Sequence, residues 1–185
     1  MLFDKPGPEN TDKTLELAFK RARELGIKNI ILASYQGETA RKLLAYQEGL
    51  NIICVTHHVG FKEAGMDEMD AKTRNSLQAR GVKILTTTHL LAGVDRAIRN
   101  HFGGVYPAEI IAQTLRIFGQ GIKVALEISV MALDAGLIPY GEEVISIAGT
   151  MTGADAACVI LPAHSNKFFD SEIREVICMP RHKKE

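Results

Sequence analysis

Short apolar segments that alternate with helical patterns constrain the fold of this chain most. Three such segments end in small polar residues: 29–34 (NIILAS), 51–56 (NIICVT) and 82–87 (VKILTT). Runs without polar alternation are typical of strands that are buried on both faces of a parallel sheet. Helical patterns lie between them and provide the crossovers of about a dozen residues that parallel strands require. The sequence therefore predicts an α/β fold.

Patterns of apolar residues and of Gly and Pro predict the remaining elements. A helix is expected over 11–25, with Asn10 or Thr11 as its N-cap and Gly26 as its stop. A helix is expected over 38–48, and residues 60–81 are expected to be polar at first and helical toward Gly81. Further helices are expected over 90–100, 107–118 and 122–136, the last almost wholly apolar. Strands are expected over 142–149 and 155–161, with a last edge strand over 172–180.

Composition excludes several classes of protein. Lys plus Arg and Asp plus Glu both number 22, so the formal charge is zero, which argues against nucleic acid or an anionic membrane as partner. No apolar run approaches the ~18–20 residues of a membrane span. Cys54, Cys158 and Cys178 stand apart in apolar runs, and no signal peptide precedes them. We expect a reduced, cytoplasmic protein that forms a single domain over residues 1–185.

The residues that follow the strands are the candidate site, because ligands of open α/β sheets bind at the carboxyl ends of the strands. Every one of these loops contains Ser or Thr, and three of the four contain Gly. Hydroxyls and backbone N–H groups suit phosphate oxygens, and Gly allows close approach; the alternative is ordinary turn and cap residues. The candidates are Ser34, Gln36, Gly37, Glu38 and Thr39; Thr56, His57, His58 and Gly60; His89; and Gly149, Thr150 and Gly153.

Two segments carry a resemblance to a known family. Residues 29–56 resemble the C-terminal α/β domain of pyruvate kinase, in which a strand ends in a Thr/Ser-Gly-x-Ser/Thr-Ala turn and the next strand ends in Val-Thr. Residues 136–160 resemble the closing β-hairpin segment of that domain. Over nearly its whole length the chain is similar to a free-standing family of pyruvate kinase α/β domain-like proteins, found mainly in archaea and some bacteria.

The resemblance implies a three-layer α/β/α sandwich with strand order 3-2-1-4-5 and strand 5 antiparallel. It places a ligand phosphate on residues 34–39, under the hairpin loop 149–153, and implies that flavin mononucleotide (FMN) can occupy the crevice. The barrel that carries the catalytic residues of pyruvate kinase is absent, so we expect no pyruvate kinase activity. Gln36 and Glu38 stand where the activator loop usually carries Lys or Arg. This favours a monophosphate with a large neutral body over a sugar bisphosphate.

The histidines after the second strand are adjacent, so in an extended segment His57 and His58 point to opposite faces and do not chelate one metal. We therefore predict no metal site. One of the histidines is expected to contact an anionic or aromatic ligand; the alternative is an imidazole bonded to backbone. Glu127, within the apolar helix, either pairs with Lys123 one turn earlier or reaches the crevice as a general base.

Three other segments leave two interpretations open. Residues 6–11 (PGPENT) either curl over the rim, where Asn10 and Thr11 form a second anion site, or form a plain helix start. Residues 99–107 form a lid or an oligomer contact. Phe168 and Phe169 lie among polar residues and suggest a subunit interface if they are exposed.

Three functions are consistent with these patterns. The first is the binding of a phosphate-bearing small molecule, with FMN as the candidate cofactor. The second is an enzyme in which His57 or His58 acts as acid and base on a phosphorylated metabolite. The third is a regulatory interaction module. A homo-oligomer is expected in each case, and the sequence does not decide whether a reaction is catalysed.

Overall fold

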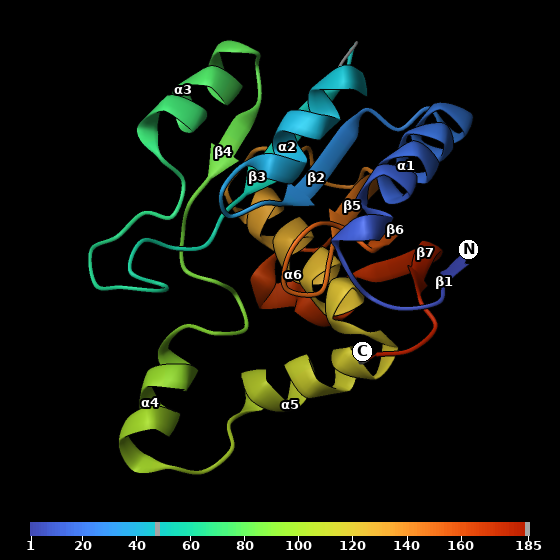
Figure 1. The fold of residues 1–185 in the computed structure, drawn as a ribbon. Helices are drawn as coiled ribbons and strands as arrows, with labels where there is room; N and C mark the ends of the chain where they lie inside the picture. Colours follow the sequence, from blue (N-terminus) through green and yellow to red (C-terminus); the bar gives the residue numbers. More distant parts are fainter. Residues whose placement is uncertain (47–48, 184–185) are drawn as a thin grey trace.

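The chain folds around one mixed sheet. A computed structural model describes residues 1–46 and 49–183, and its strands follow the order β1-β7-β6-β5-β2-β3-β4 (Figure 1). The strands are β1 (Leu2–Phe3), β2 (Asn29–Ala33), β3 (Asn51–Val55), β4 (Lys83–Leu85), β5 (Val144–Ala148), β6 (Ala156–Leu161) and β7 (Glu172–Pro180).

The predicted five-strand order is present within this sheet. The expected strands 3-2-1-4-5 are β4-β3-β2-β5-β6. β4 with β3, β3 with β2 and β2 with β5 pair in parallel, and β6 pairs antiparallel with β5. The α/β class and the antiparallel fifth strand are thereby confirmed. β7 continues the sheet beside β6, but β1 and not β7 is the edge strand. Sequence patterns missed β1 because a strand of two residues shows no periodicity.

The helices lie where the sequence predicted them, but several begin or end at other residues than predicted. They are α1 (Thr11–Leu25), α2 (Glu38–Leu43), α3 (Ala71–Ala79), α4 (Val94–Phe102), α5 (Pro107–Leu115) and α6 (Gln120–Asp134), with 3₁₀ turns η1 (Pro8–Asn10), η2 (Leu44–Tyr46), η3 (Arg116–Phe118) and η4 (Ser165–Asp170). The second predicted helix divides into α2 and η2, and its predicted end at Glu48 lies outside the described residues. Gly26 ends α1 in the left-handed conformation, as expected.

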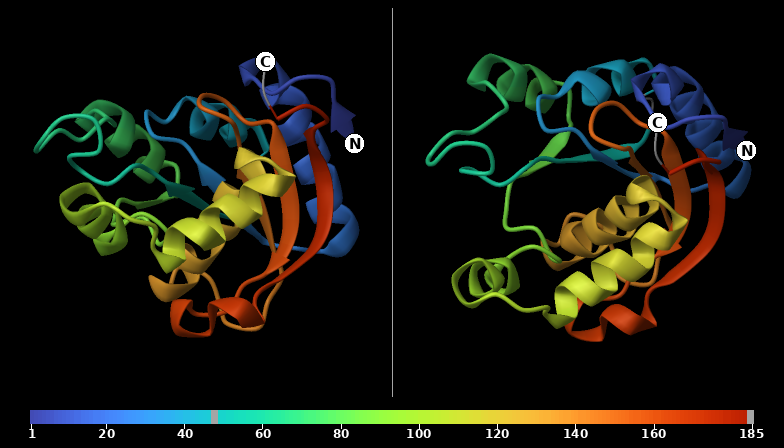
Figure 2. Two further views of the ribbon diagram at one scale, coloured as in Figure 1. Left: turned by 90° about the horizontal axis from the view of Figure 1, so that it is seen from below. Right: turned by 60° about the horizontal axis from the view of Figure 1, so that its bottom comes forward.

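The sheet is the middle layer of three. α1, α2 and α3 cover one face, and α6 covers the other, with α4 and α5 on the same side as α6 (Figure 2). Side chains of β2 alternate between the two cores: Ile30 and Leu32 face α1, and Ile31 faces α6. A strand with apolar side chains on both faces must be central, which explains the continuous apolar run in the sequence.

The segment before α1 folds back onto the loop between β5 and β6. The Thr11 hydroxyl donates to the Pro8 carbonyl (2.6 Å) and accepts from the Ala154 N–H (3.0 Å). Residues 6–11 therefore do reach the rim, as one interpretation expected. However, Thr11 is buried and its hydroxyl is already engaged, so the second anion site at Asn10 and Thr11 is not supported.

The buried carboxylate of Asp155 holds the loop between β5 and β6 in place through hydrogen bonds. Asp155 accepts hydrogen bonds at Oδ2 from the N–H groups of Gly7 (3.2 Å) and Thr150 (3.1 Å). Its Oδ1 has no hydrogen-bond partner among the described residues. Burial raises the pKa of the Asp155 carboxyl, and the hydrogen bonds from Thr150 and Gly7 offset part of that shift.

The segment between β4 and α6 forms an arm, which comprises α4, α5 and η3 (residues 94–118) (Figure 1). Arg99 pairs with Glu109 (3.0 Å), and Asp95 accepts from the Ala108 N–H (3.2 Å), so α4 is fastened to α5. The expected lid or contact at 99–107 is the turn of this arm. No helix of the described residues is both long and apolar enough to cross a membrane.

The three cysteines are unpaired and buried, as the sequence indicated. Burial raises the pKa of the Cys54 and Cys158 thiols to about 12. These two thiols are therefore protonated at neutral pH and have the character of small apolar core residues.

A substitution at Gly153 tests the contact between the N-terminal segment and the loop between β5 and β6. Its φ is +72°, and an added Cβ would lie 2.5 Å from Thr11 Oγ1 and 2.6 Å from Pro8 Cα. Gly136 has a similar φ of +67° but nothing within 4 Å. We expect Gly153→Ala to lower the free energy of unfolding by about 2 kcal/mol more than Gly136→Ala, measured by urea denaturation. Equal losses would show that the overlap is relieved without cost.

Candidate ligand-binding site

A cavity lies at the carboxyl ends of the parallel strands. It has a volume of about 710 Å³, and its wall includes residues from all four predicted loops and from the arm and α6. Parallel pairing of β2 with β3 and β5 brings these loops to one edge of the sheet. The expectation that they share one rim is met.

Ten of the predicted site residues line this cavity, and three do not. Gly37, His58 and Gly60 lie outside its lining. Those that line it are Ser34, Gln36, Glu38, Thr39, Thr56, His57, His89, Gly149, Thr150 and Gly153. That these ten bind a ligand stays a prediction.

The three exceptions have local reasons. Gly37 adopts φ +87°, and a Cβ there would point at Thr73 and Leu77 of α3, away from the cavity. Gly60 closes a turn through its N–H, which donates to the Met66 carbonyl (2.9 Å). His58 Nδ1 lies 2.8 Å from the Val59 carbonyl, the backbone-bonded arrangement that the sequence left open.

The loop after β2 presents hydroxyls and one carboxylate to the cavity. Ser34 and Thr39 are buried at its base, whereas Glu38 is exposed. Arg41 of α2 donates to the Thr73 hydroxyl of α3. Residues 34–39 themselves contain no Lys or Arg, because Gln36 and Glu38 stand where the resemblance leads one to expect a cation.

Three aromatic rings form a stack on the side of β3. The His57 ring lies between Tyr35 (centroids 4.9 Å apart) and Phe61 (3.9 Å), and all three residues line the cavity. His57 Nδ1 is 2.7 Å from Glu68 Oε2, a partner that the sequence did not reveal. When Nδ1–H donates to Glu68, Nε2 of the neutral ring remains an acceptor.

His89 lies beside this stack. Its ring is 5.7 Å from that of His57 and 5.5 Å from that of His58, and its Nε2 is 3.4 Å from the Thr56 carbonyl. Burial lowers the pKa of His89, so its neutral form is favoured at pH 7. Within the part of the chain that the structure describes, no group of three His, Cys, Asp or Glu side chains is placed to hold a metal ion.

Glu127 pairs with Lys123, the simpler of the two roles considered from the sequence. Both side chains are almost fully buried in the cavity wall, and the carboxylate also accepts from the Leu91 N–H (2.8 Å). Burial lowers the pKa of the Lys123 ammonium, Glu127 raises it, and Arg116 and Arg96 lower it again. A carboxylate engaged in this way is poorly placed to act as a general base.

Sequence reasoning missed the cationic side of the cavity. Arg96 of α4, Arg116 of η3 and Lys123 of α6 all line it, and so does Lys62 after β3. None of them stands in a motif with the strand-end loops, and only the fold brings the arm across the cavity. In the sequence, the segments of α4 and α5 show only the pattern of ordinary amphipathic helices, which does not indicate a ligand site.

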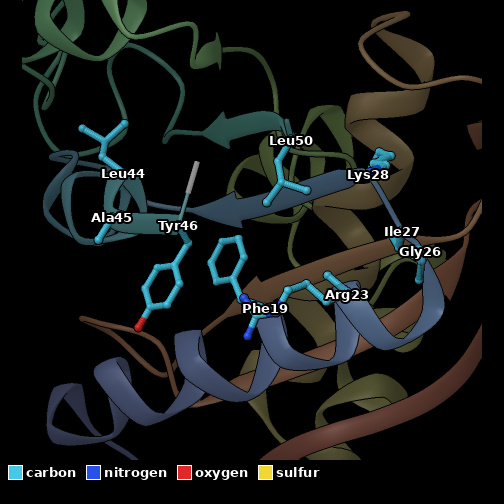
Figure 3. Close-up of a pocket in the computed structure, with 10 residues that line it drawn as sticks. Phe19, Arg23, Gly26, Ile27, Lys28, Leu44, Ala45, Tyr46 and Leu50 are labelled. Atoms are coloured by element: carbon cyan, nitrogen blue, oxygen red, sulfur yellow. The ribbon is translucent and has the colours of Figure 1, made fainter. Parts of the chain in front are cut away.

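A second hollow, of about 600 Å³, lies on the other face of the sheet between α1 and η2 (Figure 3). Phe19 and Tyr46 stack there with ring centroids 4.5 Å apart, and Arg23 and Lys28 stand at its border. It shares no lining residue with the strand-end cavity. It therefore has no part in the site described here.

The family model agrees with the fold. Residues 12–160 match the model described as the pyruvate kinase alpha/beta domain. The chain belongs to this family. Among solved structures, a Cryptosporidium parvum pyruvate kinase in complex with ADP is 19% identical, with 80% of this chain and 23% of that chain covered and a TM-score of 0.43.

A second match is to another structure of a pyruvate kinase from Cryptosporidium parvum. It is 18% identical over 79% of this chain and 22% of that chain, with a TM-score of 0.39. The pyruvate kinase alpha/beta domain chain described here thus spans less than a quarter of the length of these two proteins. The resemblance noted from residues 29–56 and 136–160 is confirmed by the family match.

The buried ion pair yields a stability prediction. Glu127→Met leaves the Lys123 ammonium buried without its carboxylate, and we expect it to lower the free energy of unfolding by about 3 kcal/mol. The double variant Lys123→Met/Glu127→Met removes both charges and is expected to recover most of that loss. Urea denaturation of Glu127→Met, Lys123→Met and the double variant gives the coupling energy between the two side chains. Strictly additive losses would mean that the pair is not coupled.

Proposed function

We propose that this pyruvate kinase alpha/beta domain protein binds a phosphate-bearing small molecule with a planar aromatic body, with FMN as the first candidate. The observation that carries the proposal is the combination of an aromatic stack and uncompensated cations in one strand-end cavity. Planar rings bind to aromatic side chains by offset stacking, and guanidinium groups bind phosphate.

The cavity fits FMN in size and chemistry. Ligand pockets typically measure about 300–1,000 Å³, and this one is about 710 Å³. Tyr35 and Phe61 supply ring surface for a flavin, and the hydroxyls of Ser34, Thr39 and Thr150 supply hydrogen bonds. When bound, a flavin supplies redox chemistry; the side chains of this cavity bind and orient it and exclude water from it.

Tyr35 gives a direct test. We expect Tyr35→Ala to weaken FMN binding about fivefold, because a lost ring contact costs about 1 kcal/mol. The measurement is quenching of flavin fluorescence on titration with purified protein. Tyr140→Ala is the matched control, since Tyr140 is exposed and stacks only on His164, away from the cavity. Equal affinity of the two variants would contradict the proposed position of the flavin.

An enzymatic function is the second candidate, and the His57–Glu68 hydrogen bond favours it. A carboxylate that orients an imidazole is a common arrangement for general acid–base catalysis. His57 is the residue that lines the cavity, and His58 is not. His57→Ala with retained ligand affinity but lost turnover of a phosphorylated metabolite would support this candidate over simple binding.

Self-association is also proposed, because the arm exposes apolar side chains. α4 buries none of its residues, although Val94, Ile98 and Phe102 form one apolar stripe. The strongly exposed apolar side chains of the arm are Val94, Phe102, Val105, Ile110, Ile117 and Phe118. Exposed apolar patches of this kind mark interaction surfaces.

Light scattering after size exclusion tests the oligomer. We expect a mass near twice the 20.3 kDa of the chain, and a monomer for the double variant Phe102→Ser/Ile110→Ser. Phe169→Ser is the control, because Phe169 is as exposed but lies on η4. A monomeric wild type would refute the proposal, and a monomeric Phe169→Ser would move the interface to η4.

A further inference from the structure

Two arginines of the arm line the cavity with no acidic partner. Arg96 and Arg116 come from different elements, α4 and η3, and neither forms an ion pair with any described residue. Arg116 Nε donates to Gln120 Oε1 (2.7 Å), which orients its guanidinium but leaves its charge uncompensated. Arg99, one turn from Arg96 on the same helix, is paired with Glu109.

These two charges converge on a third. Arg96, Arg116 and Lys123 line the same cavity. Burial lowers the pKa of the Lys123 ammonium, and the two guanidiniums lower it further. Glu127, which also lines the cavity, is occupied by Lys123 and by the Leu91 N–H, and Asp95 and Glu109 of the arm are engaged by the Ala108 N–H and by Arg99. Arg96 is exposed, Arg116 is half-buried and Lys123 is buried. Like charges that line one cavity repel each other, and an anion between them would relieve that repulsion.

The placement of the arginines is built into the fold. The Arg99–Glu109 pair and the Asp95–Ala108 hydrogen bond fix α4 on α5, and η3 runs directly into α6. The positive end of the α6 dipole lies at the same place and adds to the field of Arg116. The other carboxylates that line the cavity belong to other elements: Glu38 follows β2, and Glu68 is hydrogen-bonded to His57.

We propose that Arg96 and Arg116 form the anion subsite of this cavity and that they, rather than the Ser34–Thr39 loop, hold the phosphate of the ligand. The ligand then lies across the cavity, with its phosphate against the arm and its planar body toward Tyr35 and Phe61. This inference rests on the proposed function and specifies the orientation of its ligand. Paired guanidiniums bind phosphate through bidentate hydrogen bonds, which the Glu38-bearing loop does not offer.

The experiment compares FMN with riboflavin, which differs only by the phosphate. Fluorescence titrations of wild type, Arg96→Gln, Arg116→Gln and the double variant give both dissociation constants. We expect wild type to bind FMN at least tenfold more tightly than riboflavin, and the double variant to bind the two equally. Riboflavin affinity should not change. Arg116→Lys should recover part of the preference, because it keeps the charge and loses the bidentate geometry.

Two sets of controls decide the location of the anion. Arg23→Gln removes one positive charge on the other face of the sheet, near α1, and should leave the FMN preference intact. Ser34→Ala and Lys62→Gln remove polar groups from the other walls of the cavity. If either of these abolishes the preference while Arg96→Gln/Arg116→Gln retains it, the anion subsite is elsewhere and the inference is wrong.

Calorimetric titration with pyrophosphate separates this inference from the flavin proposal. Binding of pyrophosphate by wild type but not by Arg96→Gln/Arg116→Gln, without binding of either flavin, would retain the subsite and reject FMN as the ligand. Binding of riboflavin and FMN with equal affinity in wild type, without pyrophosphate binding, would retain a flavin site and reject the subsite. If wild type binds none of the three ligands, both proposals are wrong.

Discussion

The parallel pairing of β2 with β3 and β5 is the constraint on which the rest of the structure depends. β2 buries Ile30 and Leu32 against α1 and Ile31 against α6, so both of its faces must be covered by helices. The crossovers that parallel strands need supply those helices. Because β2, β3 and β5 are parallel, their carboxyl ends lie at the same edge of the sheet. The loops that follow them there are not paired in the sheet and can line a cavity.

Much of the fold could be predicted, because its signals are local. The apolar runs of β2 and β3 and the helical periodicity of α1 each lie within one segment of sequence. The ends were harder to predict. β4 is shorter than its apolar run, and η2 follows α2, since the last turns depend on packing and not on propensity. β1 was missed because it is defined by its pairing with β7, nearly 180 positions away.

Of the residues that line the cavity, the sequence indicated those of the strand-end loops but not those of the arm. Thr56 and Thr150 could be found because each directly follows a strand, and strand ends have a known position in an α/β sheet. Arg96, Arg116 and Glu68 could not be found in this way. They lie in helices or in a long loop, and only tertiary packing turns them toward the cavity. Gly37 lies outside the cavity lining for a local reason: it forms the turn onto α2, and a Cβ there would meet Thr73 and Leu77 of α3.

The loop between β5 and β6 has a base, Gly153 and Asp155, that the N-terminal segment holds in place. Its tip, Met151, is 90% exposed and has a φ of +67°, which is unusual for a residue with a side chain. Met151 and Thr152 line the strand-end cavity, so the proposed ligand would meet the tip of this loop. Substitutions at these two positions would change the wall of the cavity and leave the hydrogen bonds of Asp155 at the base in place.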